Sequence, residues 1–258
     1  MDNVSRREFL GKAALAAGGC AVFVLLGPGG TGSASTPAPE GGSPLGDYDW
    51  EAHRYAYLID AQKCIGCGMC VKACKAENKV PDGNFRTWIE RYEISEDGEA
   101  EVDSPNGGLN GFEENVSHIK IAKAFFVPKM CNHCKAAPCV QVCPVGATYR
   151  TEDGVVLVNP KTCIGCRYCI QACPYGARYL HPATRTADKC TFCYHRIGQG
   201  LLPACVEVCP TQARIFGDLN AAASPLSRFL RMNRIHVLKP ALNTEPKVYY
   251  AGLDGEVR

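Results

Sequence analysis

The chain has 258 residues, of which 46% are hydrophobic and 21% charged, and these values are ordinary for a globular protein. Its formal net charge of +2 at pH 7 provides no strongly basic surface, so composition gives no reason to expect nucleic acid as a partner. Seventeen cysteines are the feature that stands out from this background.

The first 36 residues look like an export signal of the twin-arginine type. Arg6 and Arg7 supply the arginine pair, the apolar run 13–26 follows, and a stretch rich in Gly, Ser, Thr and Pro comes next. The alternative is a charged terminus followed by a short buried helix, which the many glycines disfavour. We therefore expect residues 1–36 to direct export to the periplasm and residues 37–53 to form a Pro/Gly-rich linker.

Cys20 lies inside the expected signal, apart from the other cysteines. It follows Ala17-Gly18-Gly19, which fits a lipidated cysteine loosely. The apolar run continues past it to Leu26, so an incidental cysteine that is lost with the signal is the favoured interpretation.

The other sixteen cysteines fall into four groups of four. The spacing C-x2-C-x2-C-x3-C places three thiolates around one [4Fe–4S] cluster and directs the fourth to a neighbouring cluster. The first and third groups have this spacing, whereas the third cysteine is set further away in the second and fourth groups. The predicted iron ligands are Cys64, Cys67, Cys70, Cys74, Cys131, Cys134, Cys139, Cys143, Cys163, Cys166, Cys169, Cys173, Cys190, Cys193, Cys205 and Cys209.

Disulfides and structural zinc are the alternatives to clusters. Closely spaced cysteine pairs make a poor disulfide framework, and zinc sites take pairs of C-x2-C elements rather than three cysteines in one loop. An exported protein is normally a place for disulfides, but the twin-arginine route carries proteins that are already folded around their cofactors. The signal and the motifs therefore agree, and we expect four [4Fe–4S] clusters.

The pattern between the cysteines predicts an α+β fold of two ferredoxin-like modules, each holding two clusters. Strands are expected at 54–60 and 155–158, each leading into a cysteine loop, and a short helix is expected after each fourth cysteine. A proline follows the fourth cysteine of every group except the first, which has Lys75. We expect residues 54–219 to form this four-cluster domain.

An insertion at about 86–128 separates the first two groups. Strand patterns at 87–94 and 119–127 flank an acidic, Gly-rich segment, 97–111, which predicts a β-hairpin with a solvated loop. A docking surface for a partner and a merely decorated loop are equally supported interpretations.

The chain continues beyond the last cysteine for longer than cluster binding requires. Residues 220–258 are expected to form a C-terminal arm, with a short helix at 227–232 and an extended piece at 248–250. The arm would clamp the two modules or grip a partner. It contains no apolar stretch long enough to cross a membrane.

Basic residues beside the cysteines would offset the negative charge of bound clusters and raise their reduction potentials, unless they are merely solvated. They are Lys63, Lys72, Lys75, Lys135, Lys161, Arg167 and Lys189. His133 and His195 either tune a cluster or make structural hydrogen bonds, and the second role is favoured. The sequence has no nucleotide-binding glycine loop and no nucleophile motif, so no catalytic residue is expected.

With these motifs, the chain resembles the iron–sulfur (beta) subunits of the dimethyl sulfoxide reductase family, of the polysulfide, tetrathionate and thiosulfate reductase types and the type that serves formate-dependent nitrite reduction. The segment Cys190-Thr191-Phe192-Cys193-Tyr194-His195-Arg196, with Pro203-Ala204-Cys205, is typical of them. The resemblance implies that the first group shares its clusters with the fourth and the second with the third. The implied ligand sets are Cys64/Cys67/Cys70/Cys209, Cys190/Cys193/Cys205/Cys74, Cys131/Cys134/Cys139/Cys173 and Cys163/Cys166/Cys169/Cys143.

The resemblance also implies a non-catalytic electron-transfer subunit of anaerobic respiration. Its partners would be a molybdenum–pterin catalytic subunit and a quinone-reactive membrane subunit, and it would sit peripherally at the outer face of the cytoplasmic membrane. Many relatives lack a signal of their own, so Arg6-Arg7 suggests a subset that is exported independently. A soluble periplasmic carrier of the polyferredoxin type, or an assembly protein with vestigial clusters, are the alternatives.

Overall fold

The computed structural model describes residues 49, 51–113, 120–253 and 257. The expected signal and nearly all of the expected linker lie outside this part of the chain, as does Cys20. Among the described residues, no helix combines the length and the apolar character needed to span a bilayer.

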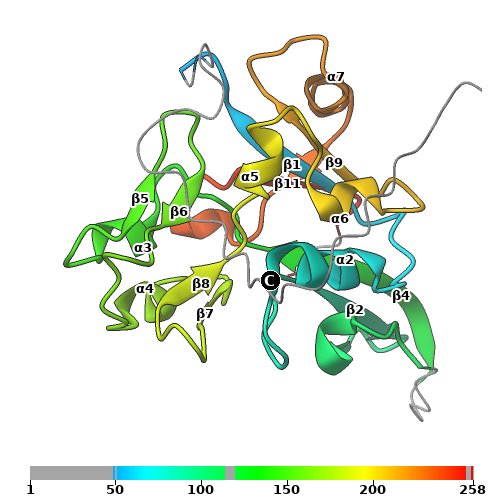
Figure 1. Cartoon of the computed structure of the whole chain (residues 1–258). Coiled ribbons are helices and arrows are strands. Elements are labelled where there is room, and N and C mark those ends of the chain that lie inside the picture. The colour runs from blue at the N-terminus through cyan, green and yellow to red at the C-terminus, as the bar shows by residue number, and fades with distance from the viewer. Residues whose placement is uncertain (1–48, 50, 114–119, 254–256, 258) are drawn as a thin grey trace, which may run out of the picture. The chain divides into compact units, whose positions relative to one another are not determined.

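The chain builds its largest sheet from two segments that are far apart in sequence (Figure 1). β1 (Tyr55–Asp60) pairs antiparallel with β9 (Arg214–Asp218) and parallel with β11 (Val248–Ala251), and β10 (Ile235–His236) completes the order β10-β11-β1-β9. β1 is buried on both faces, as its apolar sequence predicts.

The two faces of β1 pack against different parts of the chain. Ala56 and Leu58 face a cluster of apolar residues that includes Leu226 of α7 (Pro225–Met232). Helix α7 begins at Ser224, whose hydroxyl accepts a hydrogen bond from the Ser227 N–H, followed by a proline in the first turn. Tyr57 and Ile59 face the opposite way, into the main core that contains several of the cysteines.

The first module surrounds this second face. Helix α2 (Met69–Asn78) packs against α6 (Ala204–Glu207), and α5 (Tyr194–Ile197) precedes α6 in the chain. Helix α2 carries cysteines of the first group and α6 carries one of the fourth, so the fold brings the first and last groups together.

The second module contains the two middle groups. It consists of the hairpin β5–β6 (Thr148–Arg150 and Val156–Val158), the hairpin β7–β8 (Arg178–Leu180 and Ala187–Lys189), and the short helices α3 (Pro138–Gln141) and α4 (Tyr168–Gln171), which pack together. Figure 1 shows these elements gathered on one side of α2 and α6.

A helix after each fourth cysteine is the wrong expectation for three of the groups. Helices α3, α4 and α6 hold the third cysteine and end before Cys143, Cys173 and Cys209, and only α2 extends beyond its fourth cysteine, Cys74. The reason is the proline that follows the cysteine in three groups, because the residue before a proline is pushed out of the helical region. Lys75 imposes no such restriction on α2.

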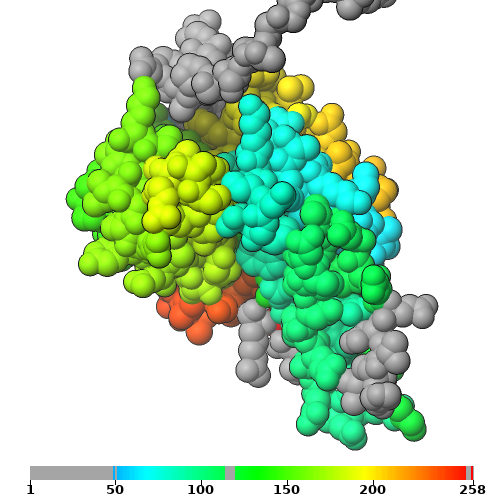
Figure 2. All heavy atoms as spheres, turned by 60° about the horizontal axis from the view of Figure 1, so that its bottom comes forward, coloured from blue at the N-terminus to red at the C-terminus, as the bar shows by residue number. Residues whose placement is uncertain are grey.

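The insertion is a three-stranded sheet in the order β3-β2-β4. β2 (Thr87–Ser95) pairs antiparallel with β4 (Ile121–Met130), and β3 (Ala100–Asp103) adds to the other edge of β2. The expected solvated loop is therefore partly wrong, since it contains β3 and the 3₁₀ turn η1 (Pro105–Gly108), whose glycines 107 and 108 are buried. In Figure 2 the insertion lies directly against the first cysteine loop.

The C-terminal segment connects the two modules. After the 3₁₀ turn η2 (Pro240–Leu242), the carbonyls of Thr244 and Glu245 accept hydrogen bonds from Ala136 and Lys135 of the second module at 3.1 and 2.9 Å. The chain then returns to the first module as β11, beside β1. The helix and the extended piece expected in this arm are observed as α7 and β11.

Candidate iron–sulfur centre

All sixteen cysteines of the four groups are described, and all are free thiols. The four expected ligand sets define sites 1 to 4 along the fold. Site 1 is Cys64, Cys67, Cys70 and Cys209; site 2 is Cys74, Cys190, Cys193 and Cys205; site 3 is Cys131, Cys134, Cys139 and Cys173; site 4 is Cys143, Cys163, Cys166 and Cys169. Among the described residues, no three Cys, His, Asp or Glu side chains meet closely enough to hold a single ion.

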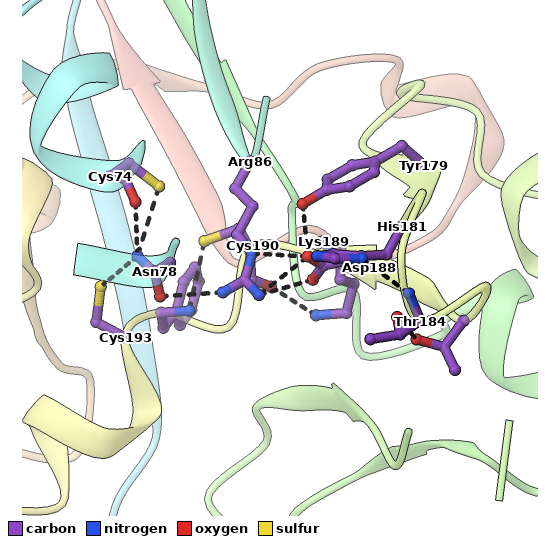
Figure 3. A network of polar contacts seen from close by, with 12 residues as sticks. Cys74, Asn78, Arg86, Tyr179, His181, Thr184, Asp188, Lys189, Cys190 and Cys193 are labelled. Carbon is purple, nitrogen blue, oxygen red and sulfur yellow. Dashed lines mark hydrogen bonds and ion pairs between the residues drawn. The ribbon is translucent and has the colours of Figure 1, made fainter. Parts of the chain in front are cut away.

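The four cysteines of site 2 line one small cavity, together with Tyr57, Asn78 and Phe192. They come from α2, from the loop before α5 and from α6. The Asn78 amide nitrogen lies 3.6 Å from the sulfurs of both Cys74 and Cys193, so it donates to two thiols that belong to different cysteine groups (Figure 3).

Tyr57 supplies a second donor to site 2. Its hydroxyl lies 3.3 Å from Cys205 Sγ at the end of a fully buried side chain. Burial, reinforced by the neighbouring cysteines, raises the pKa of Tyr57 well above its ordinary value. The hydroxyl therefore keeps its proton and is available to donate to a metal-bound thiolate of Cys205.

The four cysteines of site 3 line a separate cavity in the second module. Asn132, His133 and Arg178 also reach this cavity, and each has a buried side-chain nitrogen that finds no partner among the described residues: Asn132 Nδ2, His133 Nε2 and Arg178 Nε. An unpaired buried donor costs about 1–3 kcal/mol. The sulfur atoms of a bound cluster would accept from such donors, so the lining of this cavity suits a [4Fe–4S] cluster.

The thiols themselves need a metal to become ligands in these surroundings. Burial raises the pKa of Cys64 to about 11 and that of Cys134 to about 12. A neighbouring cation of high charge is what deprotonates a buried thiol, because metal binding replaces the proton. These thiols therefore stay protonated unless a bound metal ion takes the place of the proton.

Site 1 lies where the insertion covers the first loop. Cys64 and Cys67 occupy the loop before α2, and burial, reinforced by the nearby Cys70 and Cys209, raises the pKa of Cys64. Gly66 has φ +68°, and a Cβ atom on it would lie 2.6 Å from the Phe126 ring of β4. The insertion therefore packs tightly on this loop, and glycine is required there.

Site 4 is built from the corresponding loop of the second module. Cys163 and Cys169 pack in the small core cluster with Cys134 and Cys139 of site 3, whereas Cys166 is exposed. The Thr148 N–H donates to Cys143 Sγ at 3.4 Å. Although its slight burial opposes the effect, this and neighbouring backbone donors lower the pKa of the Cys143 thiol.

The sites follow one another in a definite order. The buried guanidinium of Arg214 interacts with Cys64 and Cys70 of site 1 and with Cys205 of site 2. Cys190 of site 2 interacts with Cys131 of site 3. Arg178 interacts with Cys139 and Cys131 of site 3 and with Cys169 of site 4. These electrostatic interactions link site 1 with site 2, site 2 with site 3 and site 3 with site 4. The packing of Cys163 and Cys169 with Cys134 and Cys139 in one core cluster agrees with the last of these links.

The basic residues expected beside the clusters have different surroundings. Lys75 donates to the carbonyls of Pro81 and Asn84, and Lys135 pairs with Glu245 on the surface. Lys63 and Lys72 are exposed, as are Lys161 and Arg167. Of the seven, Lys189 is fully buried, and it donates to the carbonyls of Val156 and Cys190.

Both histidines make hydrogen bonds within the fold. The Val156 N–H donates to His133 Nδ1 at 3.0 Å, and the imidazole stacks on Phe192 with centroids 3.6 Å apart. Burial, with nearby cations, lowers the pKa of His133 well below its ordinary value, so the ring is neutral. His195 lies on the surface 2.7 Å from a carboxylate oxygen of Glu77. These contacts agree with the structural role favoured for each.

Arg178, Arg214, Tyr57 and Asn78 are site residues that the sequence interpretation missed. The signal for the two arginines was present: each stands five residues after the fourth cysteine of its group, in Cys173-Pro-Tyr-Gly-Ala-Arg178 and Cys209-Pro-Thr-Gln-Ala-Arg214. The second group has Thr148 at the same place. Tyr57 and Asn78 have no such signal, because their contacts depend on how distant segments pack.

Two family models describe the cysteine-bearing region. Both are 4Fe-4S dicluster domains, one matching residues 63–147 and the other residues 122–219. The matches follow the sequence, whereas the modules of the fold combine the first group with the fourth. Together with the cavities they define a dicluster iron–sulfur protein of the ferredoxin type, in which sixteen cysteines fit four [4Fe–4S] clusters.

The relatives of the chain narrow this class. It is 45% identical over 204 residues to a tetrathionate reductase subunit of Salmonella typhimurium, covering 78% of this chain and 74% of the relative. It is 44% identical to protein NrfC of Escherichia coli K12 (76% and 79% covered) and 39% identical to the thiosulfate reductase electron transfer protein PhsB of Salmonella typhi (76% and 92% covered). The chain belongs to the iron–sulfur electron-transfer subunits of the dimethyl sulfoxide reductase family.

Proposed function

We propose that the chain relays electrons through sites 1 to 4, each holding one [4Fe–4S] cluster, between a quinone-reactive membrane subunit and a molybdenum-containing catalytic subunit. The observation that carries this proposal is the arrangement of the four sites across both modules: Arg214 lies at sites 1 and 2, Lys189 lies between Cys190 and the lining of site 3, and sites 3 and 4 share one core cluster. Such an arrangement suits conduction from one end to the other, and the chain itself catalyses no reaction. The sixteen cysteines would serve as ligands in the four sets numbered above.

The surfaces at the two ends of this series support contact with two partners. Ile65 and Met69 beside site 1 are 59% and 45% exposed, and Ile164 and Tyr168 beside site 4 are 65% and 58% exposed. They occupy equivalent positions in the loops Cys-Ile-Gly-Cys-Gly-Met-Cys and Cys-Ile-Gly-Cys-Arg-Tyr-Cys. Exposed apolar side chains at both ends of a relay are what two docking interfaces require.

The expected location belongs to the same proposal. The twin-arginine pattern of residues 1–36 favours export of the folded, cluster-containing protein to the periplasm. There it would lie peripherally at the outer face of the cytoplasmic membrane, held by its membrane partner. Neither partner is a nucleic acid.

The test compares the purified complex with the isolated chain. The tagged chain is purified anaerobically from solubilised membranes, and molybdenum, iron and acid-labile sulfide are measured per chain. We expect molybdenum to accompany the chain in fixed proportion, and a quinol or quinone analogue to exchange electrons rapidly with its clusters in the complex and slowly in the isolated chain. A monomeric chain without molybdenum, exchanging electrons equally fast by collision, would establish the diffusing periplasmic carrier instead.

A further inference from the structure

Three buried cations in the described chain have no carboxylate partner there. Arg178 is 5% exposed, Lys189 1% and Arg214 2%. Lys129, also buried, shows the usual arrangement, because its ammonium group lies 2.6 Å from Glu90. A buried charge without a counter-charge is strongly destabilising. Clusters bound at the cysteine sites around the other three would supply this counter-charge, because an oxidised cluster with its four thiolates carries a net negative charge.

The two arginines are held in the same way in the two modules. Arg178 donates from Nη2 to Cys139 Sγ at 3.0 Å and from Nη1 to Thr148 Oγ1 at 3.3 Å. Arg214 donates from Nη1 to Cys205 Sγ at 3.8 Å and from Nη2 to Thr87 Oγ1 at 2.8 Å. In each case a threonine fixes the guanidinium against a cysteine, although the two threonines come from unrelated segments.

Lys189 occupies the junction between the modules. It ends β8 and directly precedes Cys190 of site 2, and its ammonium group donates to the carbonyl of Cys190 at 2.7 Å. It also donates to the carbonyl of Val156, which lines the cavity of site 3. Figure 3 shows Lys189 beside Asp188 and Cys190, on the side of the network away from Asn78.

We propose that these three cations set the reduction potentials of the clusters in overlapping pairs: Arg214 those of sites 1 and 2, Lys189 those of sites 2 and 3, and Arg178 those of sites 3 and 4. The proposal rests on the cluster assignment of the proposed function. A fixed positive charge between two centres favours the reduced form of both and offsets the repulsion between electrons on neighbouring centres. All three act as positioning residues of the relay, because they contact its ligands and not a substrate.

The effect of each cation is expected to be local. The interior of the protein screens charges weakly, whereas water and salt screen exposed charges strongly. The two sites beside a removed cation should therefore lose its influence, while the two distant sites keep their potentials.

The test is an anaerobic redox titration of the isolated holoprotein, followed by EPR. In Arg178→Met, Lys189→Met and Arg214→Met, we expect the ratio of reduced to oxidised cluster at a fixed potential to fall at least tenfold for the two flanking clusters. For a one-electron centre this is about 59 mV. Arg178→Lys and Lys189→Arg, which keep the charge, should retain most of the wild-type potentials.

Lys72→Met is the matched control, because Lys72 is exposed on α2 between two proposed ligands. The clusters of the Lys72→Met variant should have the reduction potentials of the wild type. Each variant is first assayed for iron, since only a chain near sixteen iron atoms tests the proposal. Where a methionine variant loses iron, the glutamine variant at the same position is used instead, because glutamine keeps a hydrogen-bond donor and removes the charge.

Either of two results would overturn the proposal. The buried variants could shift no more than Lys72→Met, or one variant could shift all four clusters equally, as general loosening of the fold would. The isolated chain needs no partner in this titration, so its outcome is independent of the complex tested above. A wild-type protein with fewer than four clusters would instead contradict the relay.

Discussion

The two modules hold the same number of cysteines but differ in what else stabilises them. The first has a four-stranded sheet, and α7 covers one face of that sheet through apolar contacts that involve no cysteine. The second has only two-stranded hairpins, and its own core cluster has six buried residues, of which Cys134, Cys139 and Cys169 are three. Half of that core therefore consists of proposed ligands.

The loops that begin each module show the same contrast. Gly68 and Arg167 occupy equivalent positions and have nearly the same backbone conformation, with φ +72° and +67°. Gly68 lies under the insertion, where a Cβ atom would be 2.3 Å from the carbonyl oxygen of Gly108. Arg167 is exposed. The first module is thus stabilised mainly by protein packing and is covered at Gly68, whereas the second depends on its clusters and is open at the equivalent Arg167.

Removal of iron should produce the largest difference between the modules. A small core made of ligands loses its stability with its metal, because metal binding and folding are coupled. After chelation, we expect amides of the β5–β6 and β7–β8 hairpins to exchange within seconds while β1 and β9 retain protection. Hydrogen exchange with mass spectrometry measures both in one sample. Equal loss of protection in β1 and in the hairpins would show that the modules do not differ as argued.

The exchange Gly68→Arg copies the third loop into the first and should have the next largest effect. The clash with the Gly108 carbonyl and the left-handed conformation together cost about 4 kcal/mol. We expect the melting temperature of the holoprotein to fall by about 12 °C. The reverse exchange, Arg167→Gly, removes an exposed side chain and should change the melting temperature by no more than about 2 °C. Similar shifts for both variants would contradict a closed first loop.

Shortening a buried side chain of α7 tests the packing of the first module directly. Leu226 is fully buried against β1, so Leu226→Ala should cost about 3 kcal/mol, or about 9 °C in melting temperature. Met232 on the same helix is 79% exposed, and Met232→Ala is the matched control with an expected change below about 0.5 kcal/mol. Calorimetry under anaerobic conditions compares them. A small effect of Leu226→Ala would mean that the sheet contributes little.

Much of this arrangement could be predicted from the sequence because the chemistry of the ligands is local. Cysteine spacing reports which residues can reach one cluster, and the strand patterns before each loop depend on adjacent residues. The α7 helix and β11 strand also follow from short segments. The structure of segment 97–111 could not be predicted in this way, because β3 and η1 are stabilised by β2, Phe85 and Phe112 rather than by their own composition.

The site was less predictable wherever charge and burial decide a residue's role. Seven basic residues next to cysteines were expected either to influence the clusters or to be merely solvated, and of these seven only Lys189 is buried. Arg178 and Arg214, five residues from their cysteines, point inward because β7 and β9 begin there. Proximity in sequence is therefore a weak guide to electrostatic influence, which depends on the side of a strand that a residue occupies.

The C-terminal arm offers the smallest and most local test of the comparison, because two adjacent residues that contact the second module have opposite character. Thr244 is 3% exposed, and its hydroxyl lies 2.5 Å from that of Tyr175, which lines the cavity of site 3. Glu245 is exposed, and its carboxylate lies 2.9 Å from the ammonium group of Lys135. Thr244→Val should therefore cost about 1 kcal/mol, whereas Glu245→Gln should cost less than about 0.5 kcal/mol.

Both substitutions leave the backbone hydrogen bonds of the arm in place, so they separate side-chain from main-chain contributions. We expect Thr244→Val to speed amide exchange in the second module and leave β1 unchanged, since the first module does not depend on this contact. If exchange in β1 rose as much as in the hairpins, the two modules would unfold as one unit. The arm would then transmit stability between them, and the difference in their cores would have no consequence for how the protein opens.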